Sequence, residues 1–180
     1  MLSTDNTILL VIDVQGRLAQ VMDRPETLLA NVTRLVNGAQ RLGLPIIWTE
    51  QVPEKLGPTL PELAELLIES SPPVSKSSFS CWGEPTFVEA LQSAGRRQVL
   101  IAGIEAHVCV YQTARDLLAN DYEVHLVIDA ISSRTSENRT LTITRLHSAG
   151  ATLTGTEMAL FELLQVAEGE RFRAISKLVK

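Results

Sequence analysis

The chain has 180 residues, of which 16 are basic and 21 are acidic, so its formal net charge is −5. The length fits one domain, residues 1–180, and scattered basic residues in an acidic chain argue against a nucleic-acid partner. The apolar run 8–14 is too short to span a membrane, no signal peptide is recognisable, and two cysteines without framework spacing suit the cytoplasm.

Short apolar runs alternate with helical patterns along the chain. The run before Asp13 is continuously apolar, as in a strand buried on both faces. The patterns predict strands at 8–13, 45–49, 74–76, 98–102, 124–129 and 151–153. They predict helices at 25–43, near 61–70, at 84–95, 106–120 and 137–148, from a capping box at 154–157 to 166, and at 171–179.

Two of these helices carry recognisable end signals. Asp23 is placed to cap the start of the helix 25–43, and Gly43 is placed to end it. Thr154 and Glu157 have the spacing of a capping box for the helix that runs to 166.

Repeated strand–helix units need crossover connections. They predict a three-layer, Rossmann-like α/β fold, in which a six-stranded, mostly parallel sheet has helices on both faces. Ligands of such sheets bind beyond the carboxyl ends of the strands, near a switch in strand order. Asp13, Lys76 and the segment 103–109 all follow predicted strands at that edge, so we expect them to share one pocket.

Cys109 lies where a reactive cysteine is expected, at the start of the helix 106–120 and directly after a strand. The positive end of the helix dipole and the unpaired N–H groups there favour a thiolate and lower the pKa of a cysteine. The alternative is that Cys109 is a buried small hydrophobic residue, which is a common role of a free cysteine.

Asp13 and Lys76 would bring a base and a cation to the same pocket, although each has an ordinary explanation. Asp13 could cap a turn after the first strand, and Lys76 could be a solvated side chain. Lys76 is, however, one of only four lysines and is flanked by small residues. Three weak signals at matching positions in the fold favour a shared site over three coincidences.

Three segments carry a family resemblance: residues 10–15 (LVIDVQ), 76–80 (KSSFS) and 103–110 (GIEAHVCV). In this order they resemble the signature segments of the isochorismatase-like cysteine hydrolase superfamily, which includes nicotinamidases and N-carbamoylsarcosine amidohydrolase. Residues 105–109 (EAHVC), 49–51 (TEQ), 56–59 (LGPT) and 127–134 (VIDAISSR) are most similar to its isochorismatase domain-containing subgroup.

The resemblance implies a triad of Asp13, Lys76 and Cys109 that hydrolyses a small carbonyl compound at an amide-type C–N bond. The Cys109 thiolate would form a thioester, Asp13 would move the proton, and Lys76 would favour both negative charges. The N–H groups of Glu105 and Cys109 would hold the oxyanion, with a cis peptide between Ile104 and Glu105. Family members often form dimers or larger rings, so we expect a homo-oligomer.

The chain also departs from some relatives. Nicotinamidases hold a metal with an aspartate and histidines after the second strand, whereas residues 50–71 contain no histidine, so we expect no metal and no cofactor. Gln15, Phe79 and His107 are candidate substrate contacts. Phe79 is equally a typical core residue, and His107 is equally an ordinary imidazole at a helix start.

Three rival functions follow from the same residues. An ester or vinyl-ether hydrolase would use Asp13 as the acid. A non-catalytic oligomeric binding or scaffold protein would keep the triad without turnover. A redox-sensing thiol would form a sulfenic acid at Cys109 that Cys81 resolves.

Overall fold

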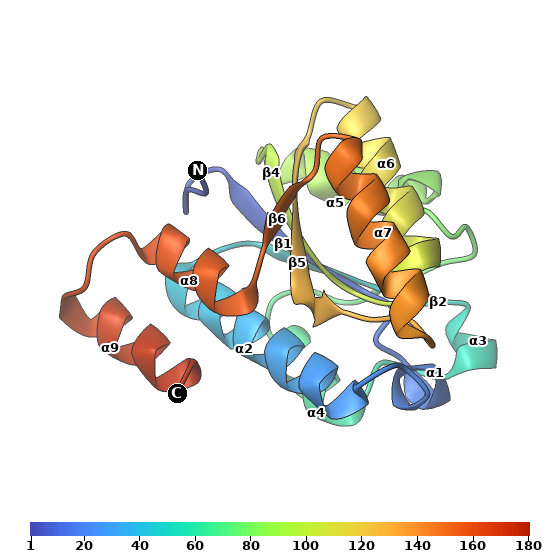
Figure 1. Cartoon of the computed structure of the whole chain (residues 1–180), viewed down its shortest axis with the longest axis horizontal. Helices are drawn as coiled ribbons and strands as arrows, with labels where there is room; N and C mark the ends of the chain where they lie inside the picture. Colours follow the sequence, from blue (N-terminus) through green and yellow to red (C-terminus); the bar gives the residue numbers. More distant parts are fainter.

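Six parallel strands form the central sheet of the computed structural model, which describes residues 1–180 (Figure 1). They are β1 (Thr7–Ile12), β2 (Ile46–Gln51), β3 (Val74–Lys76), β4 (Gln98–Gly103), β5 (Glu123–Ile131) and β6 (Thr152–Thr154). Their order is β3-β2-β1-β4-β5-β6, and every neighbouring pair is parallel. The predicted fold class is therefore confirmed, with a sheet that is entirely parallel.

Helices cover both faces of this sheet. They are α1 (Gly16–Gln20), α2 (Pro25–Leu42), α3 (Pro53–Leu56), α4 (Pro61–Leu67), α5 (Pro85–Ser93), α6 (Tyr111–Ala119), α7 (Ser136–Ser148), α8 (Thr156–Leu164) and α9 (Gly169–Leu178). A 3₁₀ turn, η1 (Cys81–Gly83), precedes α5, and a π-helical turn, η2 (Ala106–Val110), leads directly into α6.

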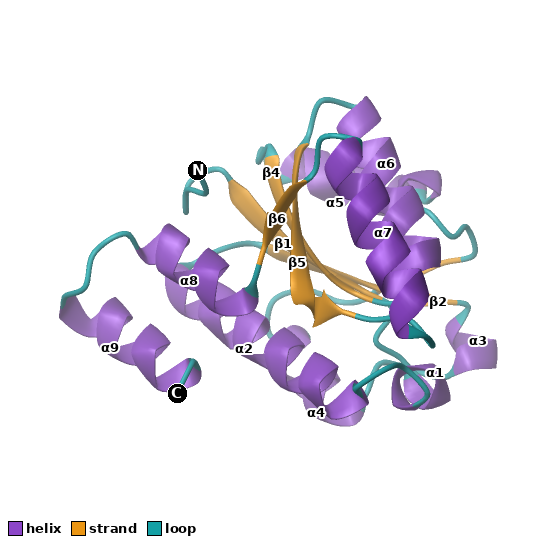
Figure 2. Ribbon diagram, viewed as in Figure 1, coloured by secondary structure: helices purple, strands orange, loops and turns teal.

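The two faces bury separate cores. Helices α2, α4, α8 and α9 pack on one face, and α5, α6 and α7 pack on the other (Figures 1 and 2). Strand residues alternate between the two cores because successive side chains point to opposite faces: Leu9 and Val11 belong to the first, and Ile8 and Leu10 to the second. No helix combines the length and the apolar character that crossing a membrane requires.

The side of the sheet to which successive strands are added switches between β1 and β4. From β1 the chain steps outward to β2 and β3, and β4 then returns to the other side of β1 and leads to β5 and β6. Parallel sheets bind ligands beyond the carboxyl ends of the strands at such a switch, which here lies between β1 and β4. At this place Ile12 pairs with Gly103.

Gly103 makes a close approach of these two strands possible. Its φ is +121°, and a Cβ at this position would lie 2.1 Å from the carbonyl oxygen of Ile12. The next residue, Ile104, donates its N–H to the same oxygen at 2.9 Å. Only glycine fits here without moving β1 away from β4.

Helix starts differ most from the predictions. Asp23 does not cap α2: the cap residue is Arg24, in the left-handed region at φ 52°, without a side-chain cap. The prediction that Gly43 ends α2 is confirmed, at φ 75°. The predicted capping box at 154–157 is also wrong, because the N–H and hydroxyl of Thr156 both donate to Asp129 Oδ1, at 2.8 and 2.9 Å. A carboxylate on β5 thus caps α8 from outside its own segment.

Other differences concern element lengths. Helices α1 and α3 lie in segments where no helix was predicted, and β2 runs on to Gln51 instead of ending at Thr49. The first turn of the expected helix 106–120 is π-helical rather than α-helical.

Candidate active site

The carboxyl ends of three strands bring the predicted triad together. Asp13 follows β1, Lys76 ends β3, and Cys109 lies in η2 after β4. All three are buried, with exposed fractions of 1%, 3% and 6%. The sheet order therefore joins residues 63 and 33 positions apart in the sequence into one cluster.

Asp13 and Lys76 form an ion pair with no solvent-exposed side chain. Lys76 Nζ lies 2.7 Å from Asp13 Oδ2, and the hydroxyl of Thr49 donates to the other carboxylate oxygen at 2.6 Å. Asp13 adopts φ 52°, which is costly for a residue with a side chain. Its N–H donates to the carbonyl of Thr49 at 3.2 Å, so β2 holds both its backbone and its carboxylate.

Lys76 is surrounded by acceptors. Besides Asp13, Nζ donates to Gln51 Oε1 at 2.6 Å and to the carbonyl oxygens of Ser78 and Phe79 at 3.3 and 3.2 Å. Burial by itself lowers the pKa of Lys76, but Asp13, Cys81 and Cys109 outweigh it and raise the pKa above its ordinary value. The side chain is therefore a charged ammonium at neutral pH.

The Cys109 thiol is neutral in this arrangement, which overturns the expected low pKa. Burial, followed by the negative charge of Asp13, raises the pKa of Cys109 to about 12, although Lys76 acts in the opposite direction. The Cys109 thiol donates a weak hydrogen bond to Gln51 Oε1, 3.9 Å from Sγ.

Gln51 is a member of the cluster that the sequence reasoning missed. It is the last residue of β2 and pairs in register with Lys76, the last residue of β3. Neighbouring residues in register place their side chains on the same face of a sheet. The predicted strand 45–49 stopped two residues short of Gln51, so this alignment with Lys76 was not seen. A strand predicted to its full length would have revealed it.

The candidate substrate contacts lie around this cluster in different ways. Gln15 is fully buried, and its amide is engaged by the main chain: Oε1 accepts from Gln51 N–H at 2.6 Å, and Nε2 donates to the carbonyls of Gln51 and Gly57 at 3.2 and 2.7 Å. Phe79 is 54% exposed. His107 is half-buried, and its Nδ1 lies 3.0 Å from the hydroxyl of Ser133.

The backbone around Glu105 confirms one expectation, the cis peptide. The Ile104–Glu105 peptide is cis, as predicted. The Glu105 N–H donates to no protein acceptor, although its neighbour Ala106 donates to the carbonyl of Ser132 at 2.7 Å. The Glu105 carboxylate forms an exposed ion pair with Arg134 at 2.9 Å.

Cys81 is a second buried thiol beside the cluster. Its Sγ lies 4.0 Å from the hydroxyl of Thr49, and burial raises its pKa to about 11. Both cysteines are free thiols. No group of three or more His, Cys, Asp or Glu side chains is arranged to hold a metal ion.

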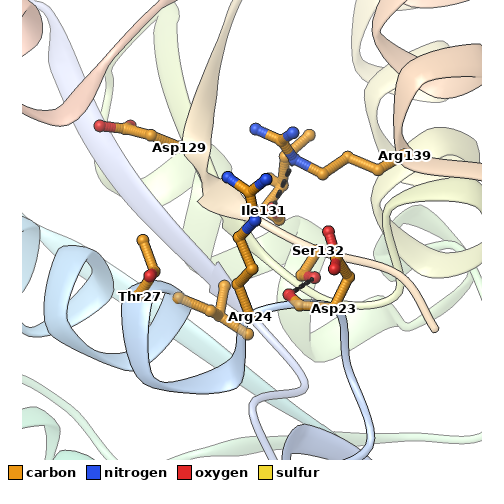
Figure 3. Close-up of a pocket in the computed structure, with 8 residues that line it drawn as sticks. Asp23, Arg24, Thr27, Asp129, Ile131, Ser132 and Arg139 are labelled. Atoms are coloured by element: carbon orange, nitrogen blue, oxygen red, sulfur yellow. Dashed lines mark hydrogen bonds between the residues drawn. The ribbon is translucent and has the colours of Figure 1, made fainter. Parts of the chain in front are cut away.

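A separate polar cavity of about 100 Å³ opens at the carboxyl end of β5 and contains none of the predicted site residues. Figure 3 shows the guanidinium groups of Arg24 and Arg139 directed toward the same space. Neither forms an ion pair, although Asp23 and Asp129 also line the cavity.

Comparison with known proteins gives consistent matches over almost the whole chain. The model of the isochorismatase domain matches residues 7–158. Isochorismatase domain-containing protein 2 of Danio rerio is 39% identical, over 99% of this chain and 89% of its own length. The secreted isochorismatase effector Isc1 of Phytophthora sojae is 37% identical, over 97% of this chain and 85% of its own length.

Solved structures are equally similar. MAR1 ribonuclease from Caenorhabditis elegans has a TM-score of 0.93 and 35% identity, covering 99% of this chain and 91% of its own. YcaC from Pseudomonas aeruginosa, solved with covalent acrylamide, has a TM-score of 0.92 and 27% identity, covering 98% and 90%. YcaC from Escherichia coli, described as an octameric hydrolase of unknown specificity, has a TM-score of 0.93 and 25% identity, covering 98% and 88%.

Proposed function

This chain belongs to the isochorismatase family of hydrolases, and we propose that it is a cysteine hydrolase that cleaves an amide-type C–N bond in a small carbonyl compound. The observation that carries the proposal is the buried convergence of Asp13, Lys76 and Cys109. An acid–base group, a fixed cation and a nucleophile within one closed cluster are the components of covalent hydrolysis. In this proposal residues 1–180 act as one catalytic domain.

The raised pKa of Cys109 determines how the first step proceeds. The thiol stays protonated until a carbonyl is bound, and its proton moves to Asp13 as Sγ attacks the carbonyl carbon. The C–N bond of the tetrahedral intermediate then breaks, and Asp13 returns the proton to the departing nitrogen. Water, activated by Asp13, next cleaves the thioester, which releases the acid and restores the thiol.

Lys76 keeps Asp13 suited to this exchange. Its ammonium stabilises the carboxylate that accepts the proton, and it favours the developing charge on sulfur. The proposed oxyanion donors are the N–H groups of Glu105 and Cys109. The unengaged N–H of Glu105 supports this role, and one such donor typically contributes about a hundredfold or more to the rate.

The remaining predicted contacts take different parts in the proposal. Phe79, with its exposed ring, and His107, fixed by Ser133, are proposed as walls of the substrate pocket. Gln15 is proposed to act indirectly, because its amide is occupied in holding Gln51 and Gly57. No metal or other cofactor enters the proposed mechanism.

Relatives support a reactive nucleophile and an assembly of copies. YcaC from P. aeruginosa carries covalent acrylamide, which is a reagent that thiols attack. YcaC from E. coli is described as octameric, and we propose that this chain also forms a homo-oligomer, which light scattering on the purified protein would measure. The two free cysteines are in keeping with the cytoplasm as the proposed compartment.

The test is a screen of small amides, ureas and esters with the wild type and three variants. Cys109→Ala is expected to lose hydrolysis, by at least about a thousandfold, while its circular dichroism stays native. Cys81→Ala removes the other buried thiol and is expected to lose far less activity. Electrospray mass spectrometry of quenched Cys109 protein should detect the acyl adduct.

Rival functions predict other outcomes of the same screen. Hydrolysis that survives in Cys109→Ala but is lost in Asp13→Asn identifies the ester or vinyl-ether reaction with Asp13 as acid. No turnover together with an inert Cys109 identifies a binding or scaffold protein. RNA is added to the substrates of the screen because the C. elegans relative is described as a ribonuclease. The net charge of −5 disfavours RNA binding, and RNA cleavage independent of Cys109 would contradict the proposal.

A further inference from the structure

Gln51 lies between the cation and the nucleophile of the cluster. Its Oε1 is 2.6 Å from Lys76 Nζ and 3.9 Å from Cys109 Sγ. The residue is 7% exposed. A single neutral oxygen therefore contacts both groups in a region from which water is largely excluded.

The orientation of this amide is fixed from two sides. Its Nε2 donates to the carbonyl of Ser77 at 2.8 Å, so Oε1 must face Lys76. Its backbone N–H donates to Gln15 Oε1 at 2.6 Å, and its carbonyl accepts from Gln15 Nε2 at 3.2 Å. An ammonium has donors only, so the opposite amide orientation would place two donors against each other.

Charge explains why a neutral amide suits this position. A carboxylate so close to Sγ would add to the effect of Asp13, which already raises the pKa of Cys109. The adjacent Glu50 has a carboxyl group, but strand alternation turns it away, and it accepts from the N–H of Thr59 at 2.7 Å.

We propose that Gln51 is a positioning residue that holds the Lys76 ammonium beside the Cys109 thiol, an inference that rests on the proposed function. Asp13 anchors the ammonium on one side, and Gln51 anchors it on the side of the nucleophile. Without Gln51 the ammonium relaxes toward Asp13 and the carbonyls of Ser78 and Phe79. The thiol then loses part of the cation that favours its ionised form.

The test measures the labelling of Cys109 by acrylamide between pH 7 and 10, with peptide mass spectrometry to separate it from Cys81. Labelling rate reports the thiolate fraction. Gln51→Met is expected to lower the thiolate fraction of Cys109, so that labelling at each pH in this range slows about tenfold. Lys76→Met is expected to slow it further.

A double-mutant cycle tests whether Gln51 acts through Lys76. If it does, adding Gln51→Met to Lys76→Met changes the labelling profile no further. The matched control is Gln98→Met. Gln98 is also buried and hydrogen-bonded, but it is the first residue of β4 and so lies at the amino ends of the strands, away from the cluster. Its replacement should lower stability without changing how the labelling rate of Cys109 depends on pH.

Each outcome separates the inference from the proposed function. If Lys76→Met slows labelling but Gln51→Met does not, or if the two effects add, the positioning role is wrong while the triad stands. If Lys76→Met leaves the profile unchanged, the triad itself fails. Should Lys76→Met not fold, the cycle is run in the Asp13→Asn background, where adding Lys76→Met leaves no unpaired charge. There Gln51→Met must slow labelling when Lys76 is present and have no effect when Lys76 is replaced.

Discussion

Two polar clusters at the carboxyl edge of one sheet follow opposite rules. Around Asp13 and Lys76 the side chains are buried, and each charge has a partner within 2.7 Å. Around Arg24 and Arg139 the cavity is open, and neither guanidinium has a carboxylate partner (Figure 3).

The difference follows from solvent. A buried charge cannot be hydrated, so its partners must be supplied by the fold at fixed distances. The exposed Arg24 is hydrated, and its neighbours contribute little to stability. The half-buried Arg139 donates to the carbonyl oxygens of Ile131 and Ile128 instead of to a carboxylate. Fixed geometry is what a reacting group needs, so the closed cluster is the region suited to catalysis.

Among the changes considered, Lys76→Met should have the largest effect on stability. The substitution leaves the Asp13 carboxylate buried without its cation, which typically costs about 3–5 kcal/mol of unfolding free energy. Arg24→Met, in the open cavity, should change stability by no more than about 0.5 kcal/mol. Urea denaturation of both variants measures the difference.

The matched control removes both charges together. Asp13→Leu/Lys76→Met should recover much of the loss, because no unpaired charge remains. A cost of less than about 1 kcal/mol for Lys76→Met alone would mean that water reaches the pair.

Thr49→Val tests the hydroxyl that binds the second oxygen of Asp13. Removing this donor leaves a buried carboxylate oxygen with one hydrogen bond fewer, at a cost of about 1–3 kcal/mol. Thr27→Val, at the exposed rim of the cavity, is the matched change and should be close to neutral. Equal decreases in melting temperature for Thr49→Val and Thr27→Val would argue against a difference between the buried cluster and the open cavity.

Asp13→Asn tests how the charge of Asp13 affects the Cys109 thiol. The negative charge of Asp13 raises the pKa of Cys109, so its removal lowers that pKa, and Lys76 then acts unopposed. Acrylamide labelling at pH 8 should accelerate by about tenfold or more even as hydrolysis is lost. Asp129→Asn, a carboxylate in the other cluster, should leave the labelling rate unchanged.

Asp129→Ala gives the smallest expected effect. It removes the acceptor for the N–H and hydroxyl of Thr156, and loss of a helix cap typically costs about 1 kcal/mol. Hydrogen exchange in the first turn of α8 should quicken while β1 and β4 stay protected. Unchanged exchange there would show that water replaces the cap.

Strand positions could be predicted because burial on both faces leaves a continuous apolar signal. The run before Asp13 is an example, and the same logic placed the triad at one sheet edge. The caps of α2 and α8 were mispredicted because sequence spacing looks only within a segment. Arg24 caps α2 through its backbone conformation, and Asp129 reaches α8 from β5.

The state of the thiol was mispredicted for a related reason. The helix-dipole argument considered only the local turn of Cys109 and left out burial and the charge of Asp13, 96 residues away in the sequence, which both raise the pKa of the thiol. Gln51 was missed because an uncharged residue near a strand end gives no signal until its register with Lys76 is known.

Gly103 has a practical consequence for anyone who redesigns this protein. Its contact with Ile12 lets the main chain, rather than any side chain, set the spacing between the segments that carry Asp13 and Cys109. A library that varies the loops at 57–60 and 132–135 can change which molecules enter while the proposed reacting groups stay in place. A library that also randomises position 103 will lose most of its members before any selection for activity begins.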